Sequence, residues 1–449
     1  MNEFNIISRF RKFFFEFRSL NWARNEYFFE INRKWKKKVT TKKEVSSILH
    51  INTTDSTGGA AKIANDLFLK QRKLGIDSKM LVALKKTKNE EIFEIPLNTS
   101  KKQHFLKFAQ DKLQWQDFFH LSSKDILECE IFKTSDIIHL HNLHGGYFSP
   151  FAVYLFGQEK PVVWSLHDMQ SFTGHCAHAF DCEKWKTGCG ECPQLSAYPS
   201  ISIDTSDFIW KTRQKIYSKS NLHIVVLSNW LREKVEKSIL SNQHIYTIHN
   251  GIDTSIYTKV DKVKAREKLN IPLESKVVLF SADMGTQNPY KGGAFVTEII
   301  EKCNEIDVLF INIGGKKDII KTSTNWEIPY VLDPHEMAQY YSAADLYLYP
   351  TLADNCPLVV LEAMSCGLPV LTFETGGVPE LVSHMNTGYI ADYKSFEDLN
   401  KGFKLLLENE KLRVEMGQNG IKRVNENFTI EIMNEKYMKI YSQITKSNY

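Results

Sequence analysis

The strongest structural signal in the sequence is LADNCPLVVLEAMSCGLPVLTFETGGVPELV, residues 352–382. Its first part places Asp354 in a loop before a predicted helix, with Glu362 eight positions further on, in the second turn. Pro357 suits the first helical position, and Asn355 is a candidate N-cap. A helix N-terminus of this kind binds a phosphate group, and carboxylates accept hydrogen bonds from sugar hydroxyls. The apolar neighbours of Glu362 indicate that it is buried and not a solvated surface residue.

The residues around this stretch continue an alternation of apolar strands and helices. Upstream, SKVVLFSAD and IDVLFINIGG are predicted strands that flank the helical KGGAFVTEIIEKCNE. PHEMAQYYSAADLYLYP predicts a helix followed by a strand, and LPVLTFETGG predicts a further strand with its turn. Strands that alternate with helices indicate a parallel sheet. We therefore expect an α/β domain over residues 261–428.

The N-terminal half begins in the same way. SSILHI predicts a strand, the following residues predict a glycine turn and a helix, and DSKMLVAL predicts a second strand. Four more apolar strands follow before residue 252. We expect an α/β fold class with two doubly wound Rossmann-like domains facing across a cleft, where ligands bind at the carboxyl ends of the strands. The predicted boundaries are an arm at 1–43, domains at 44–260 and 261–428, and a helix at 429–449 that packs back on the first domain.

These motifs together resemble the family 4 glycosyltransferases, which have the GT-B fold. The resemblance rests on the acidic-x7-acidic pattern with LEAMSCGLPV and GGVPE, and on STGGAAKIANDL, VVLSNWL, HNGID and NPYKGG elsewhere in the chain. HDMQSFTGHC and the cysteine-rich segment after it resemble the branch that builds colanic acid and related exopolysaccharides. The resemblance covers the chain from about residue 45 onward and leaves the N-terminal arm outside it.

The resemblance implies a donor-site role for each matching residue. Glu362 matches the carboxylate that holds the nucleotide ribose, and Asp354 matches an acidic residue, usually Glu, that contacts donor-sugar hydroxyls. Lys291 matches the lysine that neutralises the diphosphate, whereas Thr286 stands where the family usually has an arginine. Pro357 has no N–H to give. The predicted donor-binding residues are Gly58, Gly59, Lys291, Asp354, Asn355, Cys356, Leu358 and Glu362.

The histidines of the first domain fall near the predicted acceptor side. His167 matches a histidine that lies beside the donor sugar. His141 and His144 are predicted to lie by the acceptor, and strand alternation puts His139 and His141 on one face. Metal ligation by the histidines of IIHLHNLHGG is a less favoured alternative. The predicted catalytic residues are His167, Asp354 and Lys291.

The reaction that the resemblance implies is transfer of a hexose, with retention of configuration, from a nucleotide-diphosphate sugar to a growing, lipid-linked bacterial glycan. The protein would position the reactants and stabilise leaving-group charge. No metal is expected to bridge the phosphates, and the chain has no Asp-x-Asp motif. One alternative is a nucleotide-sugar epimerase or phosphorylase on the same fold. Another is a catalytically inactive, zinc-bearing membrane assembly protein, for which Thr286 and Asp354 are the only support.

Half of the eight cysteines lie within one short segment, as Cys176, Cys182, Cys189 and Cys192. Only the last pair has the CxxC spacing of a zinc ribbon. A structural zinc site, reduced thiols and disulfides are all compatible with the spacing, but disulfides need an oxidising compartment. We favour zinc as the cofactor because the segment is too polar to fold on a core of its own. His175 or His178 could replace one thiolate.

The basic charge of the chain is concentrated at its N-terminus. Residues 1–43 carry twelve Lys/Arg against four Glu, whereas the remaining residues carry a net charge of −4. This distribution does not support nucleic acid as a partner. Aromatic residues interleaved with cations suit a segment lying in a membrane interface, and a helix packed on the first domain is the alternative. No apolar run is long enough for an export signal or a membrane span. We expect a cytoplasmic protein, peripheral on the inner face of the plasma membrane.

Overall fold

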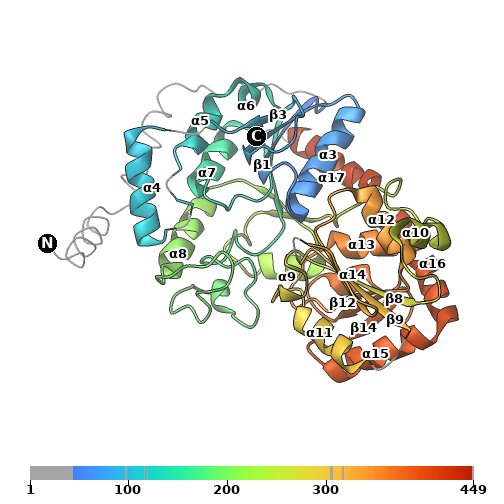
Figure 1. Ribbon diagram of the computed structural model, residues 1–449. Helices are drawn as coiled ribbons and strands as arrows, with labels where there is room; N and C mark the ends of the chain where they lie inside the picture. The colour runs from blue at the N-terminus through green and yellow to red at the C-terminus, as the bar shows by residue number, and fades with distance from the viewer. Residues whose placement is uncertain are drawn as a thin grey trace.

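The computed structural model describes residues 44–96, 99–115, 117–118, 120–303, 307–315 and 318–446. Within these residues the strands form two sheets, each of seven strands, and helices flank both sheets (Figure 1). The predicted architecture of two doubly wound α/β domains is therefore confirmed. The predicted arm at 1–43 lies outside the described residues. No described helix is both long enough and apolar enough to cross a bilayer.

The first sheet is parallel throughout. Its inner strands are apolar on both faces because helices cover both. In spatial order the strands are β3 (Ile92–Glu94), β2 (Asp77–Leu84), β1 (Ser47–Thr54), β4 (Ile137–Leu140), β5 (Val162–Leu166), β6 (His223–Val226) and β7 (His244–Thr247). The helices of this domain include α3 (Gly59–Lys73), α4 (Lys101–Leu113), α5 (Ser122–Glu128), α6 (Glu130–Thr134), α7 (Pro150–Glu159), α8 (Ser206–Tyr217) and α9 (Asn229–Val235).

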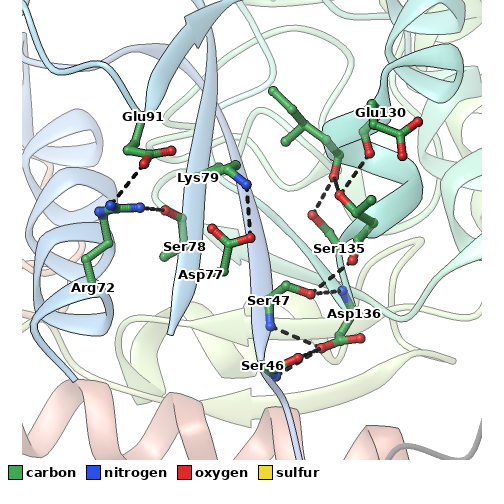
Figure 2. Close-up of polar contacts among 12 residues, drawn as sticks. Ser46, Ser47, Arg72, Asp77, Ser78, Lys79, Glu91, Glu130, Ser135 and Asp136 are labelled. Carbon is green, nitrogen blue, oxygen red and sulfur yellow. Dashed lines mark hydrogen bonds and ion pairs between the residues drawn. The ribbon is translucent and has the colours of Figure 1, made fainter. Parts of the chain in front are cut away.

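Polar contacts at the amino ends of β1 and β4 fix how these two central strands align (Figure 2). The Asp136 carboxylate accepts hydrogen bonds from the Ser46 amide at 2.9 Å and the Ser47 amide at 3.0 Å. In return, the Asp136 amide donates to the Ser47 hydroxyl at 3.0 Å. A one-residue slip would turn every side chain to the other face of the sheet. The contacts therefore help to bring the carboxyl ends of both strands to one edge.

The second sheet is parallel except for its edge strand β10. In spatial order its strands are β10 (Ile320–Lys321), β11 (Asn325–Ile328), β9 (Val308–Ile313), β8 (Lys276–Ser281), β12 (Leu346–Tyr349), β13 (Val370–Phe373) and β14 (Gly388–Ala391). Its helices include α10 (Lys262–Leu269), α11 (Gly293–Lys302), α12 (Pro334–Ala343), α13 (Leu358–Ser365), α14 (Val378–Leu381), α15 (Phe396–Glu408) and α16 (Glu410–Asn427).

The last described helix, α17 (Ile430–Lys446), returns to the first domain and lies beside α3 (Figure 1). The Tyr437 hydroxyl is 2.8 Å from the Ser165 hydroxyl of β5, and the Tyr441 hydroxyl is 2.7 Å from Nδ1 of His139 on β4. At the start of α17, a Cβ on Gly251 would lie 2.2 Å from the Thr429 carbonyl oxygen, so only glycine permits this approach. The C-terminal helix thus packs on the first sheet.

Three buried histidines lie on the first sheet, where α17 packs on it. His50, His139 and His141 are at most 1% exposed, and their ligand atoms lie within 4.8 Å of one another. Every ring nitrogen already has a hydrogen-bond partner in the protein. Burial lowers the pKa of His50 to about 4 and keeps the pKa values of the other two well below their usual range. The cluster is therefore uncharged at neutral pH.

This buried cluster predicts that mild acid destabilises the fold. An unfolded histidine titrates near pH 6.5, whereas folded His50 stays neutral down to about pH 4. Between these values the unfolded chain binds more protons, so the free energy of unfolding decreases as the pH falls. We expect a loss on the order of 2 kcal/mol per buried histidine at pH 5, measured by urea unfolding at pH 7 and pH 5.

The matched controls separate this effect from general acid sensitivity. His50→Gln removes one titrating group and should flatten the pH dependence, although it also lowers stability at pH 7. His335→Gln alters an exposed histidine and should leave the dependence unchanged. Equal pH dependence in the wild type and His50→Gln would contradict the prediction.

Candidate active site

The predicted site residues follow the carboxyl ends of β5 and β12. His167 comes directly after β5, and the loop at 350–357 comes directly after β12. The Asn355 side-chain amide donates to the carbonyls of Leu166 at 3.4 Å and His167 at 3.3 Å. The two strand ends, one from each domain, are therefore in direct contact.

The prediction that Asn355 caps α13 is wrong. The N-cap of α13 is Pro357, and no side chain caps the helix. The Asn355 amide nitrogen faces the first domain, and its oxygen accepts from the Ser228 hydroxyl. Because both ends of the amide are used between the domains, none of its polar atoms is left for the helix. The amides at the start of α13 are consequently without a side-chain cap.

Asp354 is held in the loop by three side chains. Both of its carboxylate oxygens lie 2.7 Å from Nζ of Lys291, and one also accepts from the hydroxyls of Tyr349 and Thr351, each at 2.7 Å. Burial alone would raise the pKa of Asp354, but the Lys291 ammonium and the two hydroxyls outweigh it and hold the pKa below its usual value. Asp354 is therefore ionised and forms an ion pair with Lys291.

Glu362 lies in a different environment. It is 5% exposed, and its carboxylate accepts from the Tyr341 hydroxyl at 3.1 Å. Burial raises the pKa of Glu362, and the Lys62 ammonium and nearby tyrosine hydroxyls offset only part of that rise. Lys62 lies in the first turn of α3, and its ammonium also bonds Asp66 at 3.0 Å. Sequence analysis did not identify Lys62, although it stands three residues after Gly59 in STGGAAKIANDL.

Three buried tyrosines connect the two carboxylates beneath the loop. Tyr341 on α12 meets Tyr347 on β12 with ring centroids 5.6 Å apart, and Tyr347 stacks on Tyr349 at 5.6 Å. Tyr341 donates to Glu362, Tyr349 donates to Asp354, and the Tyr347 hydroxyl is 2.8 Å from the Ser281 hydroxyl. The Tyr-x-Tyr spacing places two rings on one face of a strand. We name Tyr341, Tyr347 and Tyr349 the tyrosine ladder.

The N-terminus of α3 is open. Gly58, its N-cap, has a φ of 88°, and no side chain caps the helix. A Cβ built on Gly58 or on Gly59 meets no atom within 4 Å. The first amides of a helix lack intrahelical acceptors, and an N-terminus favours negative charge. Lys62 lies in this first turn of α3, so the start of the helix adds a positive charge that interacts with Glu362.

His167 ends a chain of hydrogen-bonded imidazoles. Its Nε2 is 3.3 Å from Nδ1 of His141, whose Nε2 is 3.0 Å from Nδ1 of His50, and that ring bonds the Gln71 oxygen at 2.8 Å. With the Gln71 oxygen accepting at one end, each neutral ring donates from Nε2 and accepts at Nδ1. Burial lowers the pKa of His167 to about 4. The chain thus leaves Nδ1 of His167 as an acceptor.

The remaining predicted acceptor-side residues are used within the protein. His141 is buried, and both of its ring nitrogens bond other imidazoles. Nε2 of His144 lies 3.1 Å from Asp168. Burial would lower the pKa of His144, but the Asp168 carboxylate outweighs it and raises the pKa. Asp168 therefore favours the protonated form of His144, and the two side chains are paired next to His167.

Comparison with known proteins accounts for both domains. Residues 57–256 match the family described as Glycosyltransferase Family 4, and residues 261–423 match Glycosyl transferases group 1. The chain belongs to the family 4 glycosyltransferases. The putative colanic acid biosynthesis glycosyl transferase WcaC of Escherichia coli K12 is 24% identical over 354 residues, which are 75% of this chain and 85% of that protein.

Solved structures agree with the GT-B fold of this glycosyltransferase. Sucrose-phosphate synthase from Thermosynechococcus elongatus aligns with a TM-score of 0.65 at 15% identity, over 89% of this chain and 99% of that one. Anabaena HepE, solved in complex with UDP-glucose, aligns with a TM-score of 0.63 at 14% identity, over 88% of this chain and 99% of that one. At this level of identity the alignments show the fold alone.

The two domains of the glycosyltransferase are joined by a set of side chains that we name the interdomain clamp: Ser228, His249, Asn250, Asn355 and Glu380. The Glu380 carboxylate accepts from the backbone amides of residues 229 and 230 at 2.8 and 2.9 Å and bonds His249 at 2.8 Å. The Asn250 amide donates to the Cys356 carbonyl at 2.8 Å. These residues come from VVLSNWL, HNGID, the 350–357 loop and GGVPE, so these motifs set the position of the second domain.

Glu380→Ala should loosen the clamp, because two amides at the start of α9 and the His249 ring lose their acceptor. We expect a loss of about 2 kcal/mol in the free energy of unfolding, measured by urea unfolding. Glu374→Ala, an exposed change in the same segment, is the control. Equal stability of the two variants would show that the clamp contributes little.

Proposed function

We propose that this glycosyltransferase moves a hexose from a nucleotide-diphosphate sugar to a growing, lipid-linked bacterial cell-surface glycan, with retention of configuration. The observation that carries the proposal is that each of two buried carboxylates interacts with a lysine, and that one of these lysines lies in the first turn of an uncapped helix. Lys62 on α3 interacts with Glu362, and Lys291 bonds Asp354. The two lysines can neutralise the charge of a diphosphate, and the two carboxylates can accept hydrogen bonds from sugar and ribose hydroxyls.

The diphosphate would be held by the α3 N-terminus and the two lysines. A phosphate beside Lys291 would compete with Asp354 for its ammonium, and the freed Asp354 oxygens could then accept from donor-sugar hydroxyls. Thr286 stands where the family usually has an arginine, so fewer cations follow β8 than in relatives. Lys62 is a cation that can compensate from the first domain. Glu362, fixed by Tyr341, would accept from the ribose.

The chemistry asked of the protein is mainly positioning and charge stabilisation. As the glycosidic bond breaks, negative charge grows on the leaving diphosphate, where helix amides and ammonium groups lower its energy. Nδ1 of His167 would accept from a sugar hydroxyl and orient the ring. Retention is the expectation carried over from the family, and the anomeric configuration of the product, read by NMR, tests it.

A panel of UDP-, GDP- and dTDP-sugars tests the donor class, because a bound donor raises the melting temperature by mass action. The solved complex of Anabaena HepE with UDP-glucose supports including UDP sugars. Donor consumption without any acceptor would favour the epimerase alternative, and absence of a shift with every nucleotide sugar would contradict the proposal.

Glu362→Gln tests the ribose site. It removes a charge-assisted acceptor that is worth about 1.5–3 kcal/mol, so the Kd of the stabilising donor should rise roughly 10- to 100-fold by calorimetry. Glu408→Gln, an exposed change at the end of α15, is the control. Wild-type affinity in a folded Glu362→Gln variant would mean that the carboxylate does not contact the donor.

We also propose that residues 1–43 hold the protein on anionic membrane at the inner face of the plasma membrane. The support is compositional: eight net positive charges with interleaved aromatic rings. Each cation near an anionic surface contributes about 1 kcal/mol. Deleting the arm should abolish co-sedimentation with liposomes that contain acidic lipid, while donor affinity stays unchanged. Undiminished binding after the deletion would place the membrane contact elsewhere.

A further inference from the structure

The cysteine-rich segment after His167 has little regular structure to hold it. Between the end of β5 and the start of α8, its only helix is a single 3-10 turn, η1 (Lys184–Lys186). The segment nevertheless folds around a pocket. The pocket is lined by all four cysteines of the segment and by His175.

We propose that Cys176, Cys182, Cys189 and Cys192 bind one structural Zn²⁺ in this pocket. None of the four is in a disulfide. The other cysteines of the chain, Cys129, Cys303, Cys356 and Cys366, lie on other elements. Four thiolates complete the tetrahedral set that structural zinc prefers and leave no open position for chemistry. The segment contributes Phe172, Ala179 and Trp185 to the core of the first domain, and a metal would add cross-links between its turns.

The backbone around the CxxC pair is shaped to present its sulfurs. Gly190 has a φ of 134° and Glu191 a φ of 45°, so two consecutive left-handed residues form a tight turn between the two cysteines. The Lys184 ammonium donates hydrogen bonds to the carbonyls of Gly190 and Glu191, at 2.9 and 2.8 Å, and so fixes this bend in the backbone. Backbone amides of residues 174 and 194 face the sulfurs of Cys189 and Cys192. Burial raises the pKa of both thiols, and these amides offset part of that rise.

His175 is held as a fifth donor. Its Nδ1 donates to the Pro199 carbonyl at 2.8 Å, so in the neutral ring Nε2 carries the lone pair. That Nε2 lies 3.4 Å from the Cys192 sulfur. A carbonyl that fixes the far nitrogen is the usual outer partner of a metal-binding histidine. In this tautomer, His175 adds a nitrogen lone pair to the donor atoms that line the pocket.

The donors line the pocket without meeting at its centre. Among the described residues, the group of three whose ligand atoms all lie within 4.8 Å is the buried histidine cluster, not a set of these cysteines. Zn–S bonds are about 2.3 Å long, so metal binding would draw the sulfurs inward.

The site would stabilise a contact between the domains. Phe180 stacks on Tyr290 at 5.7 Å, and the Tyr198 amide donates to the Tyr290 hydroxyl at 3.3 Å. Tyr290 directly precedes Lys291, the partner of Asp354. The side chain of His178 interacts electrostatically with both of those charged residues. Zinc would thus hold one wall of the active site, although the metal itself takes no part in the reaction.

Elemental analysis of the full chain, purified without added metal, tests the proposal independently of catalysis. We expect near one zinc per chain, falling at least tenfold in Cys189→Ser/Cys192→Ser. The matched control, Cys129→Ser/Cys303→Ser, changes two half-buried cysteines outside the segment and should keep its zinc. Absence of zinc in the wild type, or unchanged zinc in Cys189→Ser/Cys192→Ser, would overturn the proposal.

Measurements on the wild type keep the test sharp if the ligand variant does not fold. A thiol-binding mercurial should release the zinc as it titrates the protein, and the four loop thiols should be protected from alkylation until a chelator is added. Cobalt substitution counts the thiolates: a four-thiolate spectrum is expected, and a three-thiolate spectrum would overturn this ligand set in favour of His175. Loop thiols that react as fast as Cys129 before chelation would mean that no metal holds them.

Discussion

The Glu380 carboxylate is the contact on which the geometry of the site depends. It accepts two backbone amides at the start of α9 and bonds His249, and therefore ties the turn after β13 to the first domain. That turn supports the 350–357 loop directly, since a Cβ on Gly376 would lie 1.7 Å from the Asp354 carbonyl oxygen. A shift of the second domain would move Asp354 relative to His167, because the next residue of the loop, Asn355, bonds the Leu166 and His167 carbonyls.

The pKa values of Asp354 and Glu362 are shifted in opposite directions, because their charges are compensated to different extents. Asp354 has a lysine of its own, which keeps its pKa low, whereas Glu362 shares Lys62 with Asp66 and has a raised pKa. A buried ion pair costs desolvation that its attraction repays only with good geometry. In the function proposed above, phosphate binding near Lys291 would replace one anion by another, so the Lys291 ammonium would keep an anionic partner.

The fold could be largely predicted from periodicity, because the inner strands of a parallel sheet read as uninterrupted apolar runs. The edges could not: β3 and β10 are three and two residues long, and such short strands are determined by their neighbours and not by their own sequence. The described part of residues 85–130 contains β3, α4 and α5, whose mixed polar sequences carry only weak local propensity.

Within the site, residue type and spacing located Asp354 and Glu362, but could not show what holds them. In the sequence, Tyr347 and Tyr349 are part of an ordinary apolar strand. Only the fold shows that their hydroxyls bond Ser281 and Asp354. Asn355 is instructive because a local rule predicted a helix cap, whereas a contact with a residue 127 positions away in the chain takes its amide oxygen. Local capping gives a helix about 1 kcal/mol. The Asn355 amide gives up that gain, and in return it holds the loop against the carbonyls of Leu166 and His167 in the first domain.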